Sequence, residues 1–145
     1  DGTPYGTAWI QSGLPKDAYG FTTYAPGLFD LLMDIKDRYG DVPVYITENG
    51  YTYRRNVETM EVPNDLNDPE RISYIREHLR EANRAIKAGI NLKGYYYWSV
   101  MDCWEGPMGY GYPMGLISVN FDTLERTPRD SYYYYQKVIA NNMVD

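Results

Sequence analysis

Helix-like and strand-like segments alternate along this chain, and their order constrains the fold more than any other feature. Apolar residues recur at helical spacing over 26–40 and 69–89, and a third helix is predicted over 131–140. Between them lie two short, nearly continuous apolar runs, 44–47 and 92–100. Such runs are typical of strands buried on both faces. Strands that alternate with helices indicate a parallel sheet with helical crossovers.

Residues that favour helix starts flank these segments. Pro26 and Pro69 stand where the first helical positions are expected. Asp68 and Ser131 are predicted to cap the second and third helices. Long loops are predicted after the two strands, over 51–67 and 101–115. A short strand is then expected over 116–121.

Ionisable and aromatic residues collect where the two strand segments end. Glu48 follows the first strand and precedes Asn49-Gly50, a pair that indicates a turn. Trp98, Asp102 and Glu105 lie at or just past the end of the second strand. In open and closed α/β sheets, the carboxyl ends of parallel strands carry the active site. We therefore expect these groups to approach one pocket.

Composition excludes several classes of protein. The 145 residues are enough for one domain, and no division into separate domains is expected within 1–145. With 14 basic and 20 acidic residues the net charge is −6, which argues against a nucleic-acid partner. No apolar run is long enough for a membrane span, and Asp1 begins neither a signal segment nor a methionine start, which indicates a cut or processing site. Cys103 is the only cysteine, so an internal disulfide is excluded and a cytoplasmic location is expected.

Several ordered stretches resemble family 1 of the glycoside hydrolases, the β-glucosidase family. "YITENG" (45–50) resembles the family's nucleophile motif. "WSVMDCWEG" (98–106) is similar to its Trp-Ser-Leu-Leu-Asp-Asn-Phe-Glu-Trp ending, and "LERTPRDSYYYYQKVI" (124–139) to its closing helix. The segments 27–50 and 68–106 resemble the sixth helix with the seventh strand and the seventh helix with the eighth strand. The resemblance implies the C-terminal portion of a (β/α)8 TIM barrel, incomplete on its own, with no metal or cofactor.

The resemblance also implies roles for three residues. Glu48 becomes the catalytic nucleophile of a retaining β-glycosidase that hydrolyses β-glucosides or related β-glycosides. Trp98 becomes part of the wall or floor of the glycone subsite, and Glu105 a ligand for two sugar hydroxyls. Taken alone, Glu48 and Glu105 would be interpreted as solvated loop charges and Trp98 as a core residue. The surrounding motifs favour the functional interpretation.

The sequence departs from the family at the edge of this subsite. Gly106 stands where a second sugar-binding tryptophan is usual, Met114 where the family has Phe or Tyr, and Pro113 where Arg is common. Members that act on phosphorylated sugars typically have Ser in place of Glu105 and a Lys in the next loop. Here Glu105 is present and 110–115 holds no Lys or Arg. An uncharged sugar is favoured, and a 6-phospho-β-glycosidase remains the alternative.

The family's acid/base residue is missing from this sequence. It belongs to an Asn-Glu-Pro motif, which does not occur here. A whole barrel typically needs about 250 residues. The expected partners are therefore a β-glycoside substrate and the N-terminal remainder of the barrel, and this chain alone is predicted to be inactive. The competing hypothesis is a non-catalytic sugar-binding remnant that keeps Trp98 and Glu105.

Overall fold

The predicted alternation of helices and strands is confirmed. A computed structural model describes residues 13–17, 20–53 and 65–145. Its elements are α1 (Pro26–Tyr39), β1 (Val44–Asn49), α2 (Pro69–Lys87), β2 (Leu92–Tyr97), the short 3-10 helix η1 (Gly106–Met108), β3 (Ile117–Val119), β4 (Arg126–Pro128) and α3 (Asp130–Asn141). The second strand is shorter than predicted, and β4 was not predicted. Part of the expected loop 51–67 lies outside the described residues.

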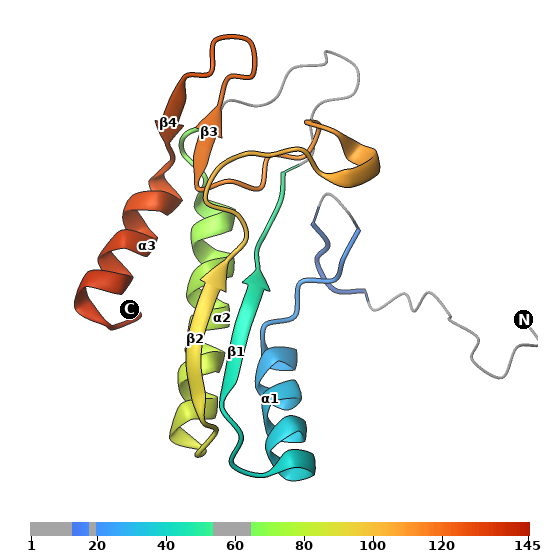
Figure 1. Ribbon diagram of the computed structural model, residues 1–145, viewed down its shortest axis with the longest axis vertical. Coiled ribbons are helices and arrows are strands. Elements are labelled where there is room, and N and C mark those ends of the chain that lie inside the picture. The colour runs from blue at the N-terminus through green and yellow to red at the C-terminus, as the bar shows by residue number, and fades with distance from the viewer. Residues whose placement is uncertain (1–12, 18–19, 54–64) are drawn as a thin grey trace, which may run out of the picture.

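The sheet that carries the candidate site has two parallel strands. β1 pairs with β2, with Val44 opposite Leu92 and Asn49 opposite Tyr97. In Figure 1, α2 runs behind the two strands while α1 and α3 flank it. β3 and β4 form a separate antiparallel pair beyond the ends of the parallel strands. Within the described residues the sheet is open and does not close into a barrel.

Apolar packing fills only the side of the sheet that faces the helices. Leu32 of α1 and Ala85 of α2 pack with Ile90, against Val44 and Ile46 of β1. A second cluster joins α2, β2 and the segment before β3 through Ile75, Tyr97 and Leu116, and tyrosines of α3 pack onto it (Tyr132, Tyr134 and Tyr135). These two clusters anchor the strands to the helices.

The opposite face of the sheet is open. Tyr45 is 55% exposed and Tyr96 is 57% exposed. The prediction of strands buried on both faces is therefore wrong for this chain. The helices cover one face, and no described element covers the other.

Asp68 occupies the predicted N-cap position of α2, with Pro69 first in the helix, but neither Asp68 nor Ser131 caps its own helix through its side chain. Asp68 does precede α2, but its carboxylate makes no capping bond to that helix. It instead accepts hydrogen bonds from the backbone N–H of Ser131 at 2.8 Å and from its hydroxyl at 2.6 Å. Ser131 lies inside the first turn of α3, after the N-cap Arg129. Asp68 thus caps α3 across the structure, which ties the starts of two helices together.

Candidate functional site

A β-bulge near the end of β1 sets the direction of Glu48. Ile46 pairs with Tyr95 and Asn49 with Tyr97, so β1 has one residue more than β2 between these pairs. As a result Thr47 and Glu48 are both exposed, whereas Ile46 and Asn49 are both partly buried. Bulges are frequent at barrel rims and beside active sites, where they redirect a side chain. Here the extra residue turns the Glu48 carboxylate away from the helices.

The residues after Glu48 fix the bulge in place. The amide of Asn49 donates to the Tyr74 hydroxyl at 3.1 Å and accepts from the Tyr95 hydroxyl at 2.6 Å. A Cβ atom on Gly50 would lie 1.8 Å from the carbonyl oxygen of Trp98, so only glycine fits there. The predicted Asn-Gly turn is wrong, because β1 continues through Asn49. The pair instead holds the end of β1 against the end of β2.

Glu48 and Trp98 line the same hollow. Its volume is about 170 Å³, and Met114 and Thr52 contribute to its wall. The backbone N–H of Trp98 donates to the carbonyl of Asn49 at 3.1 Å, and the Trp98–Ser99 peptide bond is cis. Trp98 is 40% exposed. The hollow thus offers both a carboxylate and a large aromatic side chain to a bound molecule.

Glu105 lies apart from this hollow. It precedes η1 in a tight turn, where its backbone N–H donates to the carbonyl of Gly109 at 2.8 Å and its carbonyl accepts from Met108 at 2.8 Å. Its side chain is not among those that line the hollow. The structure brings Glu48 and Trp98 together, and the sugar-binding role of Glu105 stays a prediction.

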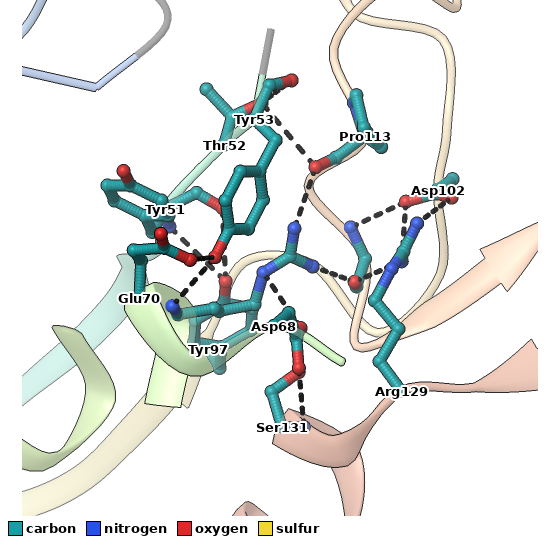
Figure 2. A network of polar contacts seen from close by, with 12 residues as sticks. Tyr51, Thr52, Tyr53, Asp68, Glu70, Tyr97, Asp102, Pro113, Arg129 and Ser131 are labelled. Carbon is teal, nitrogen blue, oxygen red and sulfur yellow. Dashed lines mark hydrogen bonds and ion pairs between the residues drawn. The ribbon is translucent and has the colours of Figure 1, made fainter. Parts of the chain in front are cut away.

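Asp102 does not approach the hollow, so the expectation that it shares one pocket with Glu48 is wrong. Its carboxylate is buried and meets the Arg129 guanidinium at 2.8 and 3.1 Å. It also accepts the backbone N–H groups of Gly115 at 2.9 Å and Val119 at 3.2 Å. Figure 2 shows this pairing. Asp102 is bonded to protein on both oxygens, and its role is structural.

Two tyrosines, buried Tyr97 and partly buried Tyr74, bond the residues that follow Glu48. Burial raises the pKa of Tyr97 to about 12, and that of Tyr74 to about 12 as well. Both phenols therefore stay neutral at physiological pH. Tyr97 accepts the N–H of Tyr51 at 3.2 Å and donates to its carbonyl at 3.3 Å. Tyr97 is buried and belongs to the second apolar cluster.

Sequence reasoning missed the buried arginine Arg71. It is 0% exposed, and its guanidinium donates to the carbonyls of Pro113 and Gly115. One signal could have found it: Arg71 lies four and seven residues before Ile75 and His78, so helical spacing places it on the buried face of α2. Among the described residues, no group of His, Cys, Asp or Glu side chains is arranged to hold a metal ion, and no helix could cross a membrane.

Comparison with known proteins identifies the family of this chain. The sequence profile described as glycosyl hydrolase family 1 matches residues 6–144. The chain belongs to glycosyl hydrolase family 1. It is 42% identical over 133 residues to β-glucosidase A of Acetivibrio thermocellus. The aligned region covers 92% of this chain and 29% of that protein. It is also 38% identical over 133 residues to a 6-phospho-β-galactosidase of Streptococcus mutans. That aligned region covers 91% of this chain and 28% of that protein.

Solved structures agree with this assignment. The family 1 β-glucosidase of Thermotoga maritima superposes with a TM-score of 0.86 at 34% identity, covering 95% of this chain and 30% of that chain. The same enzyme in complex with isofagomine lactam gives a TM-score of 0.86. The chain therefore spans less than a third of the length of these relatives. Its α/β fold is that of a portion of the family's barrel.

Proposed function

We propose that this chain supplies the nucleophile of a retaining β-glycosidase. The observation that carries the proposal is the bulge that presents Glu48 beside Trp98, within the region that matches the family. A Glu48 oxygen attacks the anomeric carbon while the bond to the leaving oxygen breaks, which gives a covalent glycosyl-enzyme. Water then attacks the same carbon, and the Glu48 carboxylate leaves. The exposed carboxylate is free to act, since it has no hydrogen bond or ion pair to another described residue.

The reaction needs a second carboxyl group, about 5–5.5 Å from the first in a retaining enzyme. That group protonates the leaving oxygen and later takes a proton from water. We propose that the remaining strands of the barrel supply it, and that residues 1–145 form one segment of a single barrel domain. The open face at Tyr45 and Tyr96, and the share of each relative that the chain covers, support this. The chain alone is then catalytically silent.

An uncharged β-glucoside is the proposed substrate, with Trp98 in the wall of the glycone subsite and Glu105 as a ligand for sugar hydroxyls. Relatives named β-glucosidase support this, as does a Thermotoga maritima β-glucosidase solved with deoxynojirimycin. The Streptococcus mutans relative keeps a 6-phosphorylated sugar as the alternative. Residues 110–115 hold no Lys or Arg to receive a phosphate, which favours the uncharged sugar.

The nucleophile is tested in the assembled enzyme, meaning this chain together with the N-terminal strands of the barrel. A 2-fluoro β-glucoside should leave a sugar on a peptide that contains residues 45–50, found by mass spectrometry. Glu48→Gln should abolish the adduct and lower kcat on the order of 10⁴-fold or more. An adduct on another carboxylate would refute the assignment. Sugar binding without any turnover in the wild-type assembly would favour the non-catalytic remnant.

Glu105 is tested through substrate discrimination. Charge-assisted hydrogen bonds are worth roughly 1.5–3 kcal/mol each, so Glu105→Ala should lower kcat/KM by about two decades or more. The variant should also lose most of the wild-type preference for a glucoside over its 4-deoxy or 6-deoxy analogue. Comparing an aryl β-glucoside with its 6-phosphate then separates the two substrate classes. Unchanged discrimination in a folded Glu105→Ala variant would place Glu105 outside the glycone subsite.

A further inference from the structure

Two buried arginines converge on one carbonyl beneath the candidate site. Arg71, in the first turn of α2, is 0% exposed, and Arg129, just before α3, is 2% exposed. Both guanidinium groups donate to the carbonyl oxygen of Gly115. Asp68 lies 3.4 Å from Arg71, and Asp102 lies 2.8 Å from Arg129, so two buried carboxylates balance the two positive charges. We call these four side chains and the Gly115 peptide the arginine clamp.

Both backbone polar groups of Gly115, the N–H and the carbonyl, are hydrogen-bonded to side chains of the clamp. Its carbonyl accepts from the two arginines, and its N–H donates to Asp102 at 2.9 Å. A Cβ atom on this residue would lie 2.2 Å from the backbone nitrogen of Asp102, so the loop passes too close for any side chain. The neighbouring residue Met114 lines the hollow, and its carbonyl accepts from Ser99 at 3.2 Å. The arginine clamp therefore fixes the position of Met114, which forms the part of the hollow's wall that comes after Trp98 in the chain.

Arg71 also contacts the segment that follows Glu48, whereas Arg129 makes no polar contact with its described residues, 49–53. Its guanidinium lies 5.3 Å from the centre of the Tyr53 ring, and the Tyr53 hydroxyl accepts the Arg71 backbone N–H at 3.3 Å. Arg71 and Thr52 both donate to the carbonyl of Pro113, at 3.0 and 3.5 Å. Figure 2 shows Thr52 and Tyr53 gathered with Pro113 around this point. One side chain thus touches both segments that frame the hollow.

We propose that Arg71 is a positioning residue that sets the distance between the Glu48 carboxylate and the wall formed by Trp98 and Met114. This proposal rests on the proposed function, in which both sides of the hollow act on one sugar. A planar guanidinium can bond two carbonyls and an aromatic face at once. A lysine keeps the charge beside Asp68 but reaches only one of these partners. A buried charge network of this kind contributes little net stability over apolar packing, yet it specifies one geometry.

The test compares two buried arginines in the assembled enzyme. Arg71→Lys should lower kcat by about 10–100-fold with a smaller change in KM, because a misplacement of about 1 Å can cost that much. Arg129→Lys should act mainly on KM, because it loosens only the wall that carries Met114. Arg80→Lys is the control on the same helix, where the side chain is 51% exposed and pairs with Glu77. It should leave both constants unchanged.

Hydrogen exchange gives a readout that does not depend on turnover. Arg71→Lys should speed exchange about tenfold at the amides of both 51–53 and 114–116, whereas Arg129→Lys should do so only at 114–116. Exchange that rises at 114–116 alone in Arg71→Lys would overturn the proposal. So would a loss of activity that follows only the loss of folded protein. An inactive wild-type assembly that still shows the paired exchange pattern would refute the proposed function and leave the link between the two segments established.

Discussion

Glu48 lies near the end of β1 and Asp102 lies past the end of β2, and the structure uses these two carboxylates in opposite ways. Glu48 is exposed beside Trp98 and has no partner among the described side chains. Asp102 is 8% exposed and bonds Arg129 and two backbone N–H groups. The contrast teaches that position at a strand end does not give a carboxylate its role. The role depends on whether the carboxylate has a partner within the protein, because a paired buried carboxylate has no free oxygen for a substrate.

The largest expected loss in the free energy of unfolding comes from removing the buried charge of Asp102. Removing the exposed charge of Glu48 should have a much smaller effect on stability. Asp102→Asn leaves the Arg129 charge buried without its partner, which should cost about 3–5 kcal/mol in the free energy of unfolding. Urea unfolding of the assembled enzyme measures it. Glu48→Gln should change that free energy by less than about 0.5 kcal/mol, although it removes activity.

A surface ion pair provides the matched control for this comparison. Asp34 pairs with Arg38 at 2.8 Å, where the two side chains are 50% and 67% exposed. Asp34→Asn should therefore cost less than about 1 kcal/mol. A cost for Asp102→Asn as small as that for Asp34→Asn would show that the arginine clamp does not hold the fold together.

The local elements and the position of Glu48 followed from the sequence because they depend on short-range patterns. Helical spacing and Pro26 set the start of α1, and the apolar run up to Thr47 set β1. The motif around Glu48 carried the resemblance to family 1, and the match of residues 6–144 to that family's profile confirms it. These signals lie within a few residues of each other, so the sequence displays them directly.

The partners of the charged residues could not be predicted because they lie far apart in the chain. Asp68 and Ser131 are 63 positions apart, so the cap that joins them has no local pattern. The bulge that redirects Glu48 depends on pairing with β2, which the sequence of β1 alone does not reveal. The carbonyl partners of Arg71, on Pro113 and Gly115, likewise depend on the course of the 101–116 loop. Long-range pairing decided which charges are structural and which are exposed.

A smaller effect is expected at Gly50, where the two strand ends meet. The added methyl group of Gly50→Ala would collide with the Trp98 carbonyl, so we expect a loss of about 1–3 kcal/mol in the free energy of unfolding. The collision also pushes Glu48 and Trp98 apart, which should lower kcat in molecules that remain folded. Gly27→Ala, in the first turn of α1, is the control: the added Cβ atom would lie 3.1 Å from the exposed Tyr24 ring, which can move aside, so the free energy of unfolding should change by less than about 0.5 kcal/mol. Equal effects at the two glycines would mean that the strand ends do not approach as closely as described.

The smallest expected effect is the pH dependence contributed by His78, a buried group away from both carboxylates. It is 5% exposed, stacks on the Tyr74 ring at 3.8 Å, and its Nδ1 lies 2.8 Å from the Tyr74 carbonyl. Burial lowers the pKa of His78 below its usual value, and the hydrogen bond to the Tyr74 carbonyl and the nearby charges of Glu77 and Glu81 only partly oppose this.

Because the pKa of His78 is lower in the folded chain, the unfolded chain binds a proton first as the pH falls below about 6.5. The folded state therefore loses stability from about pH 6.5 down through the lowered pKa. His78→Phe keeps a ring on Tyr74 but cannot bind a proton, so its unfolding free energy should fall less between pH 7.5 and about 5.5. Urea unfolding of both proteins at several pH values measures the difference. Parallel pH profiles, or an NMR titration of labelled His78 with a pKa at or above about 6.5, would contradict the prediction and show that water reaches the ring.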